Sequence, residues 1–242
     1  MKLSQFKVLT FDCYGTLIDW ESGIINALRP LTDRVSRPLS RDEILQAHAR
    51  YESRQQKWTP GRPYPAILAS VYRRLAEEWG VACGVSEAEN YGASVPSWPA
   101  FPDSAEALAY LKQHFKLVIL SNVDFRSFSG SNTRLQVEFD GIYTAEDIGS
   151  YKPSPRNFEY MLEYLADLGL EKDDILHTAE SLFHDHTPAN AFGLASCWIY
   201  RRHAQQGFGA TMDPGAMPRI DFQFTSMAEL AEAHKRECAE GL

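Results

Sequence analysis

The sequence predicts an α/β protein: a doubly wound parallel sheet with an all-helical subdomain inserted into it. Short apolar runs bounded by turn residues alternate with stretches of helical periodicity, which is the pattern of parallel βαβ units. One long segment after the first apolar run shows helical periodicity and no convincing strand. Polar residues follow four of the apolar runs, at the edge where sheets of this class bind ligands.

Six apolar runs and the helices between them make up the predicted core. The strands are expected at residues 7–11, 116–120, 141–144, 175–179, 195–199 and, with a weaker pattern, 221–224. The accompanying helices are expected at residues 104–114, 124–137 and 155–168, with a final amphipathic helix at 226–235.

The inserted segment reads as three helices at residues 21–31, 40–58 and 64–79. Ser40 followed by Glu43 forms the signature of a capping box at the start of the second. A loop this long and this structured predicts a helical subdomain at residues 20–98, and residues 1–19 and 99–242 then form the core domain.

The composition limits which partners and which cellular compartment are expected. The 242 residues are 44% hydrophobic, which suits an ordinary soluble globular protein. A net charge of −8 argues against nucleic acids and membranes as partners, but does not exclude a small anionic substrate. No apolar run is long enough to span a bilayer, and no signal-peptide region is evident. Four scattered cysteines without a C-x-x-C pair favour the reducing cytoplasm over a disulfide framework.

Asp12 is the first candidate for chemistry. The apolar run ends abruptly at this aspartate, and Gly15 and Thr16 follow in what reads as a loop. A carboxylate mounted at the end of a buried strand is suited to nucleophilic catalysis. The alternative is an aspartate that only caps a turn.

Three further strand ends carry polar groups. Ser121 and Asn122 can bind an anion or cap a helix, and Lys152 can face the same cleft or be solvated. After the fourth strand, Glu180 and Asp185 can ligate a metal or polarise water, or Asp185 can cap the helix that begins near residue 188. A single cleft explains Asp12 and these other strand ends together better than four separate structural roles do.

These motifs carry a resemblance. Asp12-x-Tyr14-Gly15-Thr16, Ser121-Asn122, Lys152-Pro153 and the stretch Glu180 to Asp185 resemble, in order, the four motifs of the haloacid dehalogenase superfamily. The likeness spans nearly the whole chain and implies a Rossmann-like core with a helical cap. Within the superfamily the sequence most resembles the (S)-2-haloacid dehalogenases of type II.

Tyr14 decides which chemistry the resemblance implies. Most members of the superfamily are phosphatases with an aspartate at this position as general acid, and they use Mg²⁺ to neutralise the phosphate. Tyr14 offers no carboxylate for that task. A 2-haloacid needs neither the acid nor the metal, because halide departs without protonation. The resemblance therefore implies a small-molecule 2-haloacid as substrate and no cofactor.

The resemblance also implies roles for individual residues. Asp12 would be the nucleophile, with Lys152 lowering its pKa. Thr16, Ser121 and Asn122, with the backbone N–H groups of Cys13 and Tyr14, would orient the substrate and active-site carboxylates. Family members place a cap arginine against the halide, and Arg50 is the candidate here, with Arg54 as runner-up.

Departures from the family pattern keep an alternative open. Phe158 stands where a tyrosine is expected, and Ser181-Leu182-Phe183 replaces Ser-x-Asn, which leaves Asp185, with His184 or His186, to position the hydrolytic water. The competing hypothesis is a Mg²⁺-dependent phosphatase whose ligands are Asp12, Glu180 and Asp185. A catalytically silent binding protein is disfavoured because Asp12 and Lys152 are both present. A homodimer is compatible with the resemblance.

Overall fold

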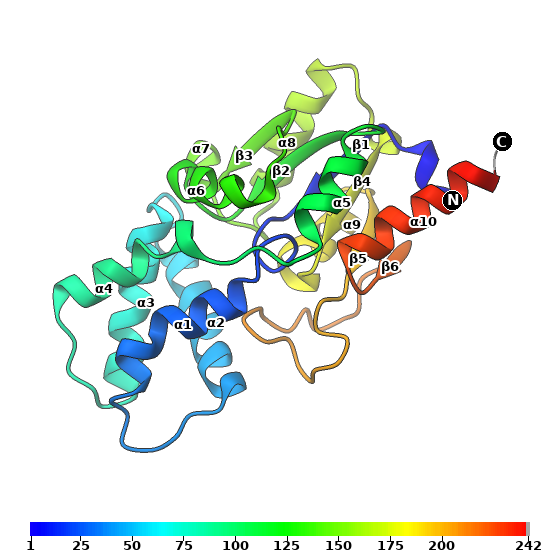
Figure 1. Cartoon of the computed structure of the whole chain (residues 1–242). Coiled ribbons are helices and arrows are strands. Elements are labelled where there is room, and N and C mark those ends of the chain that lie inside the picture. Colours follow the sequence, from blue (N-terminus) through cyan, green and yellow to red (C-terminus); the bar gives the residue numbers. More distant parts are fainter. Residues whose placement is uncertain (241–242) are drawn as a thin grey trace.

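A computed structural model describes residues 1–240 and shows one six-stranded parallel sheet. The strand order is β3-β2-β1-β4-β5-β6 (Figure 1). The strands are β1 (Val8–Phe11), β2 (Lys116–Ser121), β3 (Gly141–Thr144), β4 (Ile175–Ala179), β5 (Ala195–Ile199) and β6 (Phe222–Phe224). This sheet, covered by helices on both faces, confirms the predicted doubly wound α/β fold.

Alternating side chains of the strands feed two cores. In β2, Leu117 and Ile119 join the cluster that includes α5 (Ser104–Leu111), α6 (Phe125–Leu135) and α10 (Met227–Glu240). Val118 and Leu120 point the other way, into the cluster built with α8 (Pro155–Asp167) and α9 (Thr187–Ala191). Because successive strand residues face opposite sides, an unbroken apolar run marks a strand buried on both faces.

Four helices fill most of the chain between β1 and α5, the helix that precedes β2. They are α1 (Trp20–Thr32), α2 (Arg41–Trp58), α3 (Tyr64–Glu78) and α4 (Val85–Gly92), and they form the body beside the sheet in Figure 1. The capping box is present, with Glu43 N–H donating to Ser40 Oγ at 3.2 Å and Ser40 N–H to Glu43 Oε2 at 2.8 Å. Sequence patterning missed α4 because a helix of eight residues gives too little periodicity.

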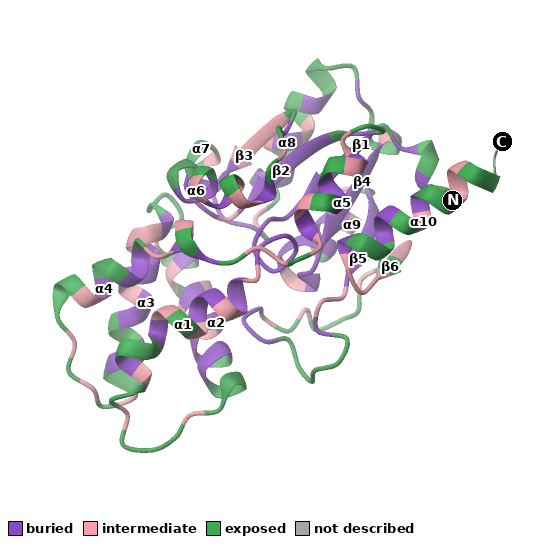
Figure 2. Ribbon diagram, in the orientation of Figure 1, coloured by how far each residue is buried: buried purple, intermediate pink, exposed green. Residues whose placement is uncertain are grey.

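The cap helices bury one side each and leave the other to solvent (Figure 2). In α2, the buried side carries His48, Glu52 and Gln56 at intervals of four residues, next to Leu45 and Ala49. A polar stripe of this kind on a buried helix face is unusual, because buried polar groups need partners. Glu52 and Gln56 of this stripe line the pocket described below.

Short turns complete the chain: η1 (Leu3–Gln5), η2 (Val95–Ser97), α7 (Ala145–Ile148), η3 (Lys172–Asp174) and η4 (Leu182–His186). The last is a single turn of π-helix between β4 and α9, a form often found at functional sites. Asp185 lies inside this turn, and Ser181 is its N-cap, so capping of a following helix is not the role of Asp185. Within residues 1–240, the helices are all too short or too polar for a membrane span.

β1 is the point where the strand order reverses. It pairs with β2 on one side and β4 on the other, so that Phe11 lies opposite both Ile119 and Thr178. In open α/β sheets the crevice at such a reversal, beyond the carboxyl ends of the strands, is the usual ligand site. The first residue past β1 at this edge is Asp12.

Candidate active site

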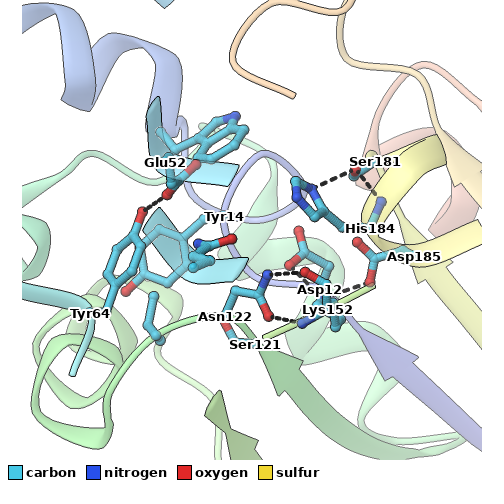
Figure 3. Close-up of a pocket in the computed structure, with 13 residues that line it drawn as sticks. Asp12, Tyr14, Glu52, Tyr64, Ser121, Asn122, Lys152, Ser181, His184 and Asp185 are labelled. Atoms are coloured by element: carbon cyan, nitrogen blue, oxygen red, sulfur yellow. Dashed lines mark hydrogen bonds and ion pairs between the residues drawn. The ribbon is translucent and has the colours of Figure 1, made fainter. Parts of the chain in front are cut away.

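A pocket between the core and the cap gathers most of the candidate residues (Figure 3). The core contributes Asp12, Tyr14, Ser121, Asn122, Val123, Lys152, Ser181, His184 and Asp185. The cap contributes Trp20, Glu52, Gln56 and Tyr64. The cavity measures about 30 Å³, which is room for water rather than for an organic acid. A neighbouring cavity of about 650 Å³ shares Gln56, Lys152 and His184 with it, so substrate could reach the pocket through this wider space.

Lys152 joins two carboxylates at the floor of the pocket. Its ammonium donates to Asp12 Oδ1 at 3.0 Å, to Asp185 Oδ1 at 2.6 Å and to the Leu120 carbonyl at 2.7 Å. The residue is 1% exposed. A buried ammonium is tolerated only when its three donors are satisfied, as they are here.

The pKa of Asp12 is shifted in the direction opposite to the predicted one. Burial raises the pKa of Asp12 to about 6, and Lys152 opposes that rise without cancelling it. The expected lowering by Lys152 is present as a contribution, but desolvation outweighs it. Asp12 therefore becomes ionised, and able to act as a nucleophile, at a higher pH than an exposed aspartate does.

Asp185 is fixed by a buried chain of hydrogen bonds that sequence reasoning missed. His177 Nε2 lies 3.0 Å from Asp185 Oδ1, and its Nδ1 lies 2.9 Å from the Thr10 hydroxyl. Burial alone would raise the pKa of Asp185, but Lys152 and the His177 bond outweigh it and hold that pKa below its usual value. His177 sits within β4, where a histidine in an apolar run was the available signal. Phe158, in place of the expected tyrosine, packs edge-on against the His177 ring.

Thr16 and Tyr14 shape the loop after β1. The Thr16 hydroxyl donates to Asp12 Oδ2 at 3.0 Å and accepts from the Glu180 N–H at 2.9 Å. Tyr14 Oη lies 2.8 Å from Ser131 Oγ, so its phenol is tied to α6. The Cys13 side chain is fully buried and does not line the pocket, which leaves only its backbone for the predicted role.

Ser121, the last residue of β2, and Asn122, which follows it, differ in their hydrogen bonds. The Ser121 hydroxyl is buried and has no hydrogen-bond partner within residues 1–240, so it is free for a ligand. The Asn122 amide is occupied: it accepts from the Lys152 N–H at 2.7 Å and donates to the Lys152 carbonyl at 3.0 Å. Asn122 thus holds the lysine loop, and because it also lines the pocket, the substrate contact expected of it stays a prediction.

The structure corrects the expectation for the cap arginine. Arg50 projects from the outer side of α2 and pairs with Glu78 at 2.6 Å, and it does not line the pocket. Arg54 lines a separate cavity with Tyr51 and Glu77. Arg50 follows His48 by two positions, and Arg54 follows Glu52 by two positions. Both arginines therefore lie off the buried stripe of α2. The halide contact predicted for Arg50 is therefore not available in this arrangement.

Neutral histidines surround Asp185. Burial lowers the pKa values of His184 and His186 to about 4, so both are uncharged at neutral pH. His184 lines the pocket, with its Nδ1 3.1 Å from the Ser181 hydroxyl, whereas His186 Nε2 lies 2.9 Å from the Ala179 carbonyl, outside the pocket lining. Of the two, His184 is placed to meet a water in the pocket.

Of the three residues of the magnesium alternative, Asp12 and Asp185 come together, and Glu180 lies apart from them. Glu180 lines another cavity, with Arg201 and Arg202, and burial, followed by the nearby Glu21, raises its pKa to about 8. The ammonium of Lys152 already bridges Asp12 and Asp185. Across residues 1–240, no group of three or more metal-ligating His, Cys, Asp or Glu side chains is present. Asp12, Glu180 and Asp185 therefore do not form the predicted three-ligand site in this arrangement, and we derive no step through the ion.

Comparison with known proteins gives consistent relatives. The family model of haloacid dehalogenase-like hydrolases matches residues 6–178. Haloacetate dehalogenase H-2 of Moraxella sp. (strain B) is 24% identical over 204 residues, which cover 82% of this chain and 88% of that protein.

Solved structures share the fold. The L-2-haloacid dehalogenase of Xanthobacter autotrophicus with chloropropionic acid covalently bound superposes with a TM-score of 0.74 at 18% identity, over 95% of this chain and 98% of that one. The hydrolase YfnB of Bacillus subtilis bound to magnesium gives 0.72 at 20%, over 95% and 99%. Together with the match of the family model to most of its length, these findings show that the chain belongs to the haloacid dehalogenase-like hydrolases.

Proposed function

We propose that this hydrolase removes halide from short (S)-2-haloacids and yields 2-hydroxy acids through an ester on Asp12. The observation that carries the proposal is the ion pair between Asp12 Oδ1 and Lys152 Nζ at 3.0 Å, in a pocket where Tyr14 stands in place of a general acid. The Lys152 ammonium favours the ionised form of Asp12 against the opposing effect of burial on its pKa. Dehalogenases among the relatives support the assignment.

In the first step, an Asp12 oxygen attacks C2 of the haloacid from the side opposite the halogen. A carbon–oxygen bond forms as the carbon–halogen bond breaks, and its electron pair leaves with the halide. The free Ser121 hydroxyl and the backbone N–H groups after β1 would hold the substrate carboxylate. Exclusion of bulk water from so small a pocket favours displacement over side reactions.

In the second step, water attacks the carbonyl carbon of the Asp12 ester. Asp185 Oδ2 has no hydrogen-bond partner within the described chain, and neutral His184 lines the same pocket. Both can accept a hydrogen bond from that water. Hydrolysis breaks the ester, releases the 2-hydroxy acid and a proton, and regenerates the Asp12 carboxylate.

The test measures chloride release from (S)-2-chloropropionate in the presence of a chelator. Hydrolysis of p-nitrophenyl phosphate with Mg²⁺ is measured in parallel, because YfnB was solved with magnesium. We expect chloride release that Asp12→Asn abolishes. Phosphate release without chloride release would overturn the proposal in favour of the phosphatase, and an active Asp12→Asn variant would remove Asp12 as nucleophile.

A further inference from the structure

The cap side of the pocket lacks a positive charge. Among the described residues that line the pocket, Lys152 is the sole lysine or arginine, and its three donors are already used. Arg50, on the outer side of α2, cannot supply the missing charge. An anion that departs on the side away from Asp12 therefore meets other groups.

Glu52 is one of the groups that such an anion would meet on the cap side of the pocket. It is 3% exposed, and the Tyr64 hydroxyl donates to its Oε1 at 2.7 Å. Its Oε2 lies 3.9 Å from His48 Nδ1 and has no hydrogen-bond partner within residues 1–240. Figure 3 shows Glu52 and Asp12 on opposite sides of the pocket. One carboxyl oxygen is thus anchored, and the other is left without a partner.

Gln56 follows one turn later on the same buried stripe. It is 6% exposed, it lines the pocket, and its amide makes no hydrogen bond with any residue of the described chain. Its amide atoms are not fully enclosed by protein, so they can hydrogen-bond to water or to a ligand in the cavity. Glu52 and Gln56 of α2 therefore both face the cavity with side-chain atoms that have no hydrogen-bond partner in the described chain.

We propose that neutral Glu52, together with the Gln56 amide, donates hydrogen bonds to the halide as it leaves and thereby replaces a cap cation. The inference rests on the proposed dehalogenation. The electron pair of the carbon–halogen bond leaves with the halide, and the proton stays on Glu52 throughout. An ionised Glu52 would repel the halide instead, so the donor works only while the carboxyl is protonated.

The surroundings of Glu52 make that protonation accessible. Burial raises the pKa of Glu52 to about 7, against the opposing effect of the Tyr64 hydrogen bond. Burial lowers the pKa of His48 to about 3, so this neighbour on the same helix is uncharged. The other titratable groups around Glu52 are tyrosines whose pKa values burial raises, on α3, α4 and the core: Tyr64, Tyr91, Tyr14 and Tyr151.

The pH dependence follows with a definite sign. Neutral Glu52 is present below its pKa of about 7 and is lost as the pH rises through it. Asp12 must be ionised, which requires a pH above about 6. Turnover should therefore rise on the acid side as Asp12 ionises and decline on the alkaline side as Glu52 ionises.

The experiment measures kcat/KM for chloride release from (S)-2-chloropropionate between pH 5.5 and 9. Glu52→Gln keeps a donor that does not titrate, so its alkaline decline should vanish and its rate at pH 8.5 should exceed the wild-type rate. Glu52→Ala should be about tenfold slower at pH 6.5, the loss expected for one hydrogen bond. Glu77→Gln, a matched change on the exposed cap surface, should follow the wild type.

A second measurement needs no variant at the pocket. Bromide, as a product analogue, should inhibit the wild-type enzyme more strongly at pH 6 than at pH 8.5. Retention of the alkaline decline by Glu52→Gln, or bromide inhibition that is independent of pH, would overturn the donor role. Absence of chloride release from the wild type at every pH would instead overturn the proposed function itself.

Discussion

At the scale of single residues, one ammonium group organises the site. Lys152 forms ion pairs with both Asp12 and Asp185, and each carboxylate keeps one oxygen outside that contact. The position of the lysine is itself fixed by the Asn122 amide, which brackets its backbone. The proposed nucleophile therefore depends on a residue 140 positions away in the chain.

Replacement of Lys152 tests this arrangement. Lys152→Met leaves two buried carboxylates facing each other, and we expect at least a ~100-fold loss of turnover and a loss of about 3 kcal/mol in the free energy of unfolding at pH 8. The stability loss should shrink toward pH 5, because the freed carboxyls take up protons in the folded state and their mutual repulsion falls. Urea unfolding at both pH values measures it. Lys7→Met, at an exposed ion pair, is the control, and an equal loss at both pH values would contradict this account.

At the scale of elements, the two faces of α2 make different contacts. Its buried stripe of His48, Glu52 and Gln56 faces the pocket or its surroundings, whereas Arg50 points outward to Glu78. The resemblance suggests an arginine on this helix but cannot say which face is buried, because both faces of α2 carry charged residues. The spacing of four residues along the polar stripe was the signal available in the sequence.

Arg50, on the outer face of α2, has a position in the structure that differs from the role implied by the resemblance. Arg50→Gln should keep kcat/KM for chloride release within about twofold, because the side chain does not reach the pocket. It should cost less than about 1 kcal/mol of stability, since the pair with Glu78 is partly exposed. Steady-state kinetics and thermal unfolding measure both effects. A loss of turnover of a hundredfold or more would return Arg50 to the site and refute the assignment of the pocket-facing side of α2.

The sheet was predictable because its strands are buried on both faces. Each run such as residues 175–179 is apolar enough to stand out, and polar residues mark where it ends. Asp12, Lys152 and Asp185 were predictable as neighbours for the same reason, because each follows a different strand of one parallel sheet. Contacts between distant elements were not predictable: Tyr64 with Glu52, and His177 with Asp185, depend on how helices and strands pack rather than on local pattern.

At the scale of the whole molecule, buried acids link folding to pH. Burial raises the pKa of Glu180 from 4.5 to about 8, so its neutral form is favoured in the folded state. The unfolded chain loses this proton first as the pH rises, and Glu180 therefore reduces the free energy of unfolding progressively from about pH 4.5 to about pH 8.

Glu180→Gln should remove this dependence. Relative to the wild type, the variant should gain roughly 2–4 kcal/mol in the free energy of unfolding between pH 4.5 and pH 8.5. Urea denaturation across that range measures the difference. A constant difference between the two proteins would mean that Glu180 is not held neutral in the folded state.

The central claim is that Asp12 forms an ester that water then cleaves at the Asp12 carbonyl carbon. Turnover of (S)-2-chloropropionate in water enriched in oxygen-18, followed by mass spectrometry of the peptide that contains Asp12, tests it most directly. We predict oxygen-18 in the Asp12 carboxylate after many turnovers, and an unlabelled first product after a single turnover. Oxygen-18 in the first product, with none in the peptide, would contradict the account, because water would then have attacked the substrate directly.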